Sequence, residues 1–159
     1  MQNVNLHKQK LYALIIAAVA LISLLLPWMS VSYNFGGFGG GGSRSVNGFR
    51  GWGYLSFIGI IAVVVSALLE DKTKEYQGNP KMIAMGAFGL IAIGAIVFML
   101  RVNAVGGAGF QGVKSSPGFG LFIALAAGIA GIAWVAGLIK LPDTPSHPTS
   151  SAPPPPPPQ

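Results

Sequence analysis

The chain is organised around one glycine-rich stretch, PWMSVSYNFGGFGGGGSRSVNGFRGWG, which runs from Pro27 to Gly53. It is the longest segment between the hydrophobic runs, and it carries two of the three tryptophans. Uncharged apolar runs flank it, Leu11–Met29 before it and Trp52–Leu69 after it. We therefore interpret this stretch as a loop held between membrane helices.

The composition excludes an ordinary soluble domain, because 52% of the residues are hydrophobic and only 9% are charged. Soluble domains carry about 25% charged residues, so most of this surface must face lipid. There are no cysteines, and the two histidines, His7 and His147, lie near the ends, so we expect no metal and no cofactor. The net charge of +6 does not predict nucleic-acid binding, because the Lys and Arg residues are spread singly between apolar runs.

Four apolar runs predict membrane-spanning helices. A helix needs about 20 apolar residues to cross the hydrocarbon core, and the alternation typical of a barrel strand is absent. We predict an all-α four-helix transmembrane bundle over residues 11–140, between an N-terminal segment (1–10) and a disordered proline-rich tail (141–159). The predicted spans are Leu11–Met29, Trp52–Leu69, Met82–Leu100 and Gly118–Ile139.

The first span has an alternative interpretation as a signal peptide cleaved after Ser32. Its apolar core is longer than the usual ~7–15 residues, and no Ala-x-Ala motif follows it. We therefore favour an uncleaved anchor.

Charge counting predicts the orientation of the spans, since Lys and Arg concentrate in cytoplasmic loops. All four acidic residues, Glu70, Asp71, Glu75 and Asp143, lie on the same side as the larger group of cations. We predict a multi-pass protein of the bacterial inner membrane with both termini cytoplasmic and both glycine-rich loops outside. The predicted inner cations are Lys8, Lys10, Lys72, Lys74, Lys81 and Lys140, and the predicted outer ones are Arg44, Arg50, Arg101 and Lys114.

Small residues predict where the helices touch, because close contact between apolar helices in lipid depends on them. The fourth span has Gly120, Ala124 and Gly128 at four-residue steps, and the third has Gly86 and Gly89 near one face. We expect these two helices to pack most tightly. The alternative is that glycine and alanine are simply common in membrane helices.

A short pattern occurs twice, as Gly51-Trp52-Gly53 and Gly118-Phe119-Gly120, each at the start of a predicted span. It suggests two tandem hairpins that arose by duplication. The alternative is that such patterns are common at membrane edges.

Aromatic and basic residues mark two further features. Aromatic side chains gather at membrane interfaces, so we predict that role for Tyr12, Trp28, Trp52, Tyr54 and Trp134. In the first glycine-rich loop, residues with recognition potential are Phe35, Phe38, Arg44, Phe49 and Arg50. The loop is either a flexible connector whose aromatics fold onto the helix ends, or a site for a ligand or partner.

The predicted spans contain no charged residue and no histidine, which argues against an ion-coupled transporter and against an enzyme. Residues 37–42 match the G-x-G-x-x-G pattern, but no strand and helix are expected around them, so we discount phosphate binding. We predict a structural or protein-interaction role for a protein that has lipid and a membrane protein or a second copy as partners. The alternative is a small channel or permease-like subunit that forms a pore on oligomerisation.

The sequence Leu25-Leu26-Pro27-Trp28, followed by the glycine-rich loop and Gly51-Trp52-Gly53, resembles small four-span bacterial membrane proteins. The resemblance covers roughly the first seventy residues. It implies an integral protein of the bacterial inner membrane and supplies no catalytic residues.

Overall fold

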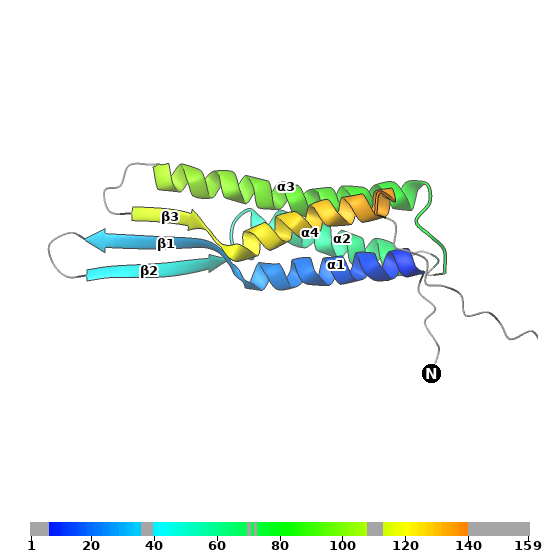
Figure 1. Ribbon diagram of the computed structural model, residues 1–159, viewed down its shortest axis with the longest axis horizontal. Helices are drawn as coiled ribbons and strands as arrows, with labels where there is room; N and C mark the ends of the chain where they lie inside the picture. Colours follow the sequence, from blue (N-terminus) through cyan, green and yellow to red (C-terminus); the bar gives the residue numbers. More distant parts are fainter. Residues whose placement is uncertain (1–6, 36–39, 70, 72, 108–112, 140–159) are drawn as a thin grey trace, which may run out of the picture.

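The computed structural model describes residues 7–35, 40–69, 71, 73–107 and 113–139. Four helices lie side by side, and a three-stranded sheet extends from one end of them (Figure 1). The proline-rich tail and the loop residue Phe38 lie outside the described residues. The elements are α1 (Lys8–Leu25), β1 (Pro27–Phe35), β2 (Gly40–Asn47), α2 (Gly53–Leu69), α3 (Asn79–Gly107), β3 (Val113–Pro117) and α4 (Phe119–Ala136).

Three of the helices are long and apolar enough to cross a membrane, over Lys8–Leu25, Asn79–Ala104 and Phe119–Ala136. The fourth, α2, is a shorter apolar helix of 17 residues. These findings confirm the predicted four apolar helices and indicate an integral membrane protein. The helix α1 ends four residues earlier than the predicted span, because Pro27 disfavours a helical Leu26, which is extended at φ −76° and ψ 161°.

The prediction of a purely all-α fold is wrong, because both glycine-rich connections contribute strands. The sheet has the order β2-β1-β3, and both pairings are antiparallel. The hairpin of β1 and β2 pairs Ser30 with Ser45 and Val31 with Arg44. The β1 sequence from Ser30 to Tyr33 alternates small polar with apolar residues, which is the pattern of a strand with two different faces.

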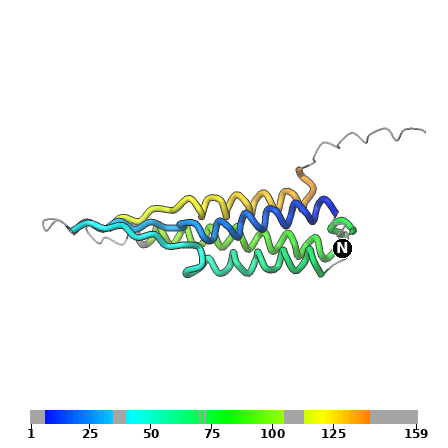
Figure 2. Tube along the Cα trace, turned by 90° about the horizontal axis from the view of Figure 1, so that it is seen from below, coloured from blue at the N-terminus to red at the C-terminus, as the bar shows by residue number. Residues whose placement is uncertain are grey.

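The helices form a ring in which each packs against its neighbours in the sequence, and α1 closes the ring against α4. We call the end that carries the sheet the sheet end, and the other the opposite end; α1 begins and α4 ends at the opposite end (Figure 2). The helix α3, at 29 residues, is the longest, and it extends alongside the sheet (Figure 1). The described hairpins differ, since α1 and α2 are joined through two strands whereas α3 and α4 have one described strand between them; the duplication stays a prediction.

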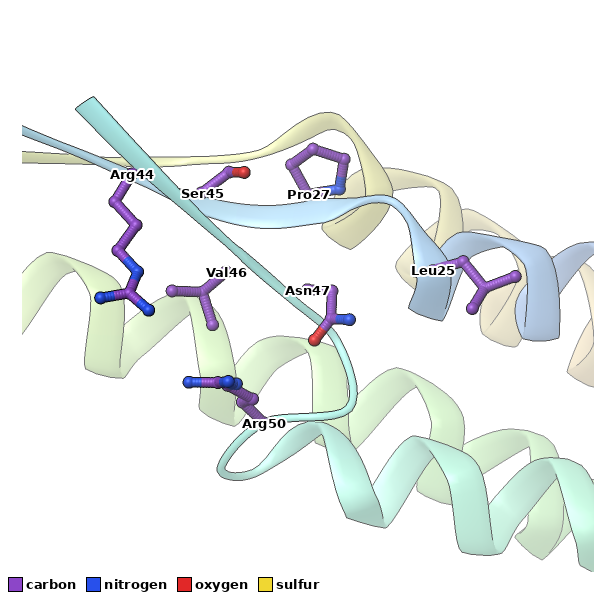
Figure 3. Close-up of a pocket in the computed structure, with 7 residues that line it drawn as sticks. All are labelled: Leu25, Pro27, Arg44, Ser45, Val46, Asn47 and Arg50. Carbon is purple, nitrogen blue, oxygen red and sulfur yellow. The ribbon is translucent and has the colours of Figure 1, made fainter.

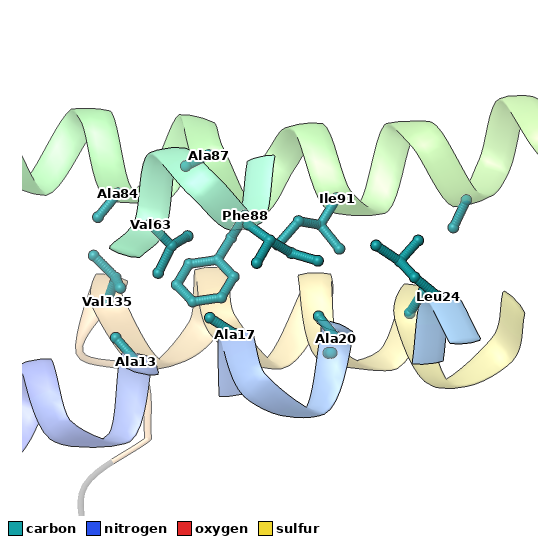
Figure 4. Packing of buried hydrophobic residues seen from close by; sticks show 14 of the residues in the cluster. Ala13, Ala17, Ala20, Leu24, Val63, Ala84, Ala87, Phe88, Ile91 and Val135 are labelled. Carbon is teal, nitrogen blue, oxygen red and sulfur yellow. The ribbon is translucent and has the colours of Figure 1, made fainter. Parts of the chain in front are cut away.

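The core is formed by small side chains of α1 against large side chains of α3 (Figure 4). Ala13, Ala17 and Ala20 recur at helical spacing and are fully buried. Their small size leaves room for Phe88 and Ile91, which also have no exposed surface. The bundle interior is therefore filled by side chains.

Glycine contacts between helices partly follow the predicted set. In α4, Gly120, Ala124 and Gly128 are buried, and a Cβ on Gly128 would lie 2.8 Å from the backbone nitrogen of Ala92 in α3. The predicted residues Gly86 and Gly89 make no such contact: a Cβ on either meets no described atom within 4 Å.

The close approaches of α3 use other glycines. A Cβ on Gly59 of α2 would lie 2.6 Å from the carbonyl oxygen of Ala87, and one on Gly94 would collide with Ser56. The Ser56 hydroxyl also donates to the carbonyl of Ile91 at 2.9 Å, which adds a hydrogen bond between α2 and α3. The backbone of α3 therefore approaches the backbones of both α2 and α4 closely, whereas the sequence predicted this for α4 alone.

Polar groups join three segments at the opposite end. The Tyr76 backbone N–H donates to Gln9 Oε1 at 2.9 Å, and the Trp134 indole donates to the Gln9 carbonyl at 2.9 Å. Lys10 is fully buried; its Nζ donates to the backbone carbonyl of Asp71 at 2.8 Å and lies 5.2 Å from the Tyr76 ring centroid. The expected N-terminal segment 1–10 therefore includes the start of α1, where His7 accepts a hydrogen bond from the Gln9 N–H.

We predict that Gly128→Leu destabilises the bundle in detergent by about 1–3 kcal/mol, the usual effect of overpacking. The matched control is Gly86→Leu, which makes the same change on α3 where the new side chain has open space. Thermal unfolding of both variants measures the difference. Equal stabilities for the two variants would contradict the packing described here.

Candidate functional site

The sheet is attached to the helices through the buried side chain of Trp28. The Trp28 indole Nε1–H donates to the Ser23 carbonyl at 2.7 Å, and its ring meets Phe98 of α3 edge-on at 5.2 Å between centroids. The backbone N–H of Gly48 donates to the Leu24 carbonyl at 2.9 Å. The Gly48 donor satisfies a carbonyl at the end of α1 that the helix itself leaves unpaired. The indole is a second donor to the Ser23 carbonyl, which also accepts from the Leu26 N–H at 3.2 Å.

Glycines make room for this tryptophan on two further elements. A Cβ on Gly48, in the turn toward α2, would lie 2.5 Å from the indole ring, and one on Gly120 of α4 would lie 2.9 Å from it. The N–H of Gly118 donates to the Trp28 carbonyl at 2.8 Å, just before α4 begins. All four helices or their connecting turns therefore meet at one side chain, and the sheet leaves the bundle in a defined direction.

One face of the sheet lies against α3. Val31 of β1 stands opposite Arg44 of β2 and Ser115 of β3, and directly paired residues point to the same face. The Ser115 hydroxyl donates to the carbonyl of Val102 at 2.8 Å, which joins this face to the last turns of α3.

The other face is lined by hydroxyl groups. The register places Ser30, Ser45 and Ser116 in one row and Ser43, Ser32 and Lys114 in the next. We call this set the serine face. All of its members are exposed except Ser30, which is half-buried.

The strand β2 forms an open edge of the sheet. Among the described residues, β2 pairs only with β1, and its eight residues, Gly40–Asn47, are mostly exposed. An edge strand presents unpaired N–H and C=O groups to another chain. No proline interrupts this edge, and its side chains are mainly glycine and serine.

Two adjacent hollows lie where the sheet meets the helices. The first, of about 310 Å³, has Arg44, Ser45, Asn47 and Arg50 in its lining and is mainly polar (Figure 3). The second, of about 220 Å³, is apolar, and Val46 and Arg50 line both. The remaining lining residues of the second hollow are Met29, Gly51, Trp52, Phe98, Arg101 and Val102.

The electrostatics of the sheet end are wholly cationic. The Arg101 guanidinium lies 5.5 Å from the centroid of Trp52, and within the described chain Arg44 and Arg50 form no ion pair. Residues 1–69 and 76–142 contain no Asp or Glu. The two described carboxylates, Asp71 and Glu75, belong to the α2–α3 connection at the opposite end.

At that opposite end, the Thr73 hydroxyl donates to Asp71 Oδ1 at 2.8 Å. This hydrogen bond, with that from the Thr73 N–H and the charge of Lys74, lowers the pKa of Asp71.

The predicted interface aromatics fall into two groups. Tyr12, Trp52 and Tyr54 are exposed on the helices, and Trp134 is half-buried against the Tyr12 ring. Trp28, by contrast, has no exposed surface and is enclosed by the protein. In the sequence, its position at the end of an apolar run fits either an interface aromatic or a core residue. Only the packing shows that the side chain is buried.

The predicted recognition residues are partly brought together. Arg44 and Arg50 line the same hollow, whereas Phe49 turns away and packs on Phe57 of α2 at 5.6 Å. Phe35 is the last residue of β1, and its side chain lies outside the described part. The flexible-connector interpretation of the loop is wrong for the residues that form β1 and β2. Sequence reasoning missed Asn47, Trp52 and Arg101 as neighbours of these arginines, because they come from three separate elements.

We predict that Ser115→Ala loosens the sheet from α3, because it removes the hydrogen bond to Val102, at a cost of about 1 kcal/mol. Hydrogen exchange of the β3 amides should speed up several-fold. The control is Ser116→Ala on the exposed face of the same strand, which should leave exchange unchanged. Equal exchange in both variants would contradict this docking.

The arrangement offers donors and cations at the sheet end and a strand edge beside them. No protein-family model matches the chain, and a search of curated proteins gives no match. The function therefore has to be argued from the residues of this chain and their geometry.

Proposed function

We propose that this chain is a non-enzymatic integral protein of the bacterial inner membrane that receives an extended segment of a partner protein on the open edge of β2. The observation that carries the proposal is this edge: an eight-residue, mostly exposed strand whose outer side has no strand partner among the described residues. Strand addition to a sheet edge is a common mode of peptide recognition, in which backbone hydrogen bonds supply the affinity.

The way in which the sheet is held supports this role. Trp28 and the Ser115–Val102 hydrogen bond fix the sheet on the bundle, so the edge is ordered before a partner arrives. An ordered binding surface loses less conformational entropy on association. The small side chains of β2 also let another backbone approach closely.

A catalytic role has little chemical support. The chain has no cysteine, and the two described carboxylates, Asp71 and Glu75, lie outside the sheet end, where the hollows are. The hydroxyls of the serine face lack a neighbouring histidine or carboxylate in the register, and their one basic neighbour is the exposed Lys114.

The channel alternative, which forms its pore on oligomerisation, gains no support from the interior of the bundle. Trp28, Phe88 and Ile91 are fully buried inside the ring of helices. A pore would therefore have to lie between subunits. The participation of Ala13, Ala17 and Ala20 in the core also favours retention of α1 as an anchor over its removal as a signal peptide.

The proposed topology puts the sheet outside and the α2–α3 connection in the cytoplasm. Because the chain has no cysteine, single cysteines can report on each side. We predict that a membrane-impermeant maleimide applied to intact cells labels Ser43→Cys and spares Gln77→Cys, both of which replace exposed residues. After lysis both should react. Labelling of Gln77→Cys alone in intact cells would reverse the orientation.

Photo-crosslinking tests the strand edge directly. A photo-reactive residue at Ser43, introduced in native cells, should give one discrete adduct with a partner polypeptide. The matched position is Ser116, which is exposed on β3, the strand on the other side of β1, and should give none.

Proline substitutions identify whether the backbone edge makes the contact. Successive residues of a strand direct their N–H groups to opposite sides, so Gly41→Pro and Gly42→Pro differ in the side they affect. A Cβ at either position meets a side chain of β1, so both variants lose some thermal stability. The proline that lowers it less faces the open edge, and it should abolish the adduct. An adduct that survives this variant, or no adduct at Ser43, would refute strand addition.

A further inference from the structure

We propose that the two hollows at the sheet end form one binding site for an anionic phospholipid of the adjoining leaflet. The phosphate would lie among Arg44, Arg50 and Asn47, and part of an acyl chain would enter the apolar hollow beside Trp52. This site uses side chains at the end of β2 nearest the helices, whereas strand addition uses the backbone N–H and C=O groups of that strand. The two proposals can therefore fail separately.

The position of the hollows corresponds to the headgroup level of a bilayer. Trp52, Tyr54 and Phe119 are exposed at the starts of α2 and α4, with 45%, 58% and 73% of their surfaces accessible. Exposed aromatics at helix ends are typical of the membrane–water interface. Arg50 lies three residues before α2 begins at Gly53, so at this level its guanidinium would meet lipid phosphates.

The polar hollow has the chemistry of an anion site. Arg44 comes from β2 and Arg50 from the turn into α2, and Figure 3 shows both side chains at the same hollow as Asn47. Guanidinium groups bind phosphate oxygens through paired, charge-assisted hydrogen bonds. No acidic residue occurs in the segments that build this end, so these charges are available to a ligand.

The apolar hollow selects an amphiphile over a soluble anion. Val46 and Arg50 line both hollows, so the two spaces adjoin. Met29, Phe98 and Trp52 give the second space an apolar wall, which a free phosphate would leave empty. A lipid fills both, because its charged head and its chain are covalently joined.

Arg101 adds a second cation next to the apolar hollow. Its guanidinium lies over the face of Trp52, a contact that holds the charge near the mouth of the hollow. The neighbouring Gly51 has φ +64°, a conformation that turns the chain sharply between Arg50 and Trp52. That turn brings a cation and an aromatic ring to the same site.

Native mass spectrometry of the purified full chain tests the site, with phosphatidylglycerol and phosphatidylcholine added at equal concentrations in detergent. We expect one phosphatidylglycerol to be retained in preference to phosphatidylcholine, and Arg50→Gln to lower this preference roughly tenfold. The control is Lys114→Gln, which removes the same charge from the serine face and should leave the preference unchanged. Thermal unfolding verifies that both variants fold.

Two competitors separate a lipid from a soluble anion. Glycerol 3-phosphate and inorganic phosphate carry the charge without an acyl chain, and neither should displace the bound lipid at millimolar concentration. Displacement by either would show that the site recognises only an anion and would overturn the lipid assignment. An equal loss of preference in Lys114→Gln and Arg50→Gln, or no preference in the unmodified chain, would also overturn it.

Discussion

The structure depends on the burial of one side chain, Trp28, at the point where α1 becomes a strand. Pro27 ends the helix, and the carbonyls left at its end need donors. The Trp28 indole supplies one to Ser23, and the Gly48 N–H supplies another to Leu24. The same indole ring packs on Phe98 of α3 and fits where Gly120 of α4 has no side chain. One residue therefore both follows the end of α1 and joins α1 to two other helices.

The two ends of the bundle differ in how their cations are placed: one end buries a lysine, and the other exposes its arginines. At the opposite end, the buried ammonium of Lys10 donates to the Asp71 carbonyl and lies over Tyr76, because a charge out of water needs compensating contacts. At the sheet end, the exposed Arg44 and Arg50 line the polar hollow, and Arg50 also lines the apolar one, with no carboxylate in the neighbouring sequence. The buried ammonium therefore joins α1 to the α2–α3 connection at one end, and the exposed guanidinium groups are accessible to a ligand at the other.

Local patterns in the sequence predicted the helices well and the sheet poorly. A membrane helix is recognisable because hydrophobicity adds up along a single segment, as in α4. The strands depend on pairing between residues far apart, such as Ser32 with Lys114, and the many glycines of β2 hid the alternation of β1. The burial of Trp28 was missed for the same reason, since its partners Phe98 and Gly120 lie distant in sequence.

The sequence by itself determined the class of the protein: apolar runs long enough for a bilayer, acids confined to a few positions, and cations without acids around the glycine-rich segments. Those properties belong to single segments and do not depend on their neighbours. Only the tertiary structure decided that Gly128 meets Ala92 while Gly86 faces open space. It also decided that Arg44, Arg50, Trp52 and Arg101 border a common pair of hollows, because that requires β2, a turn and α3 to converge.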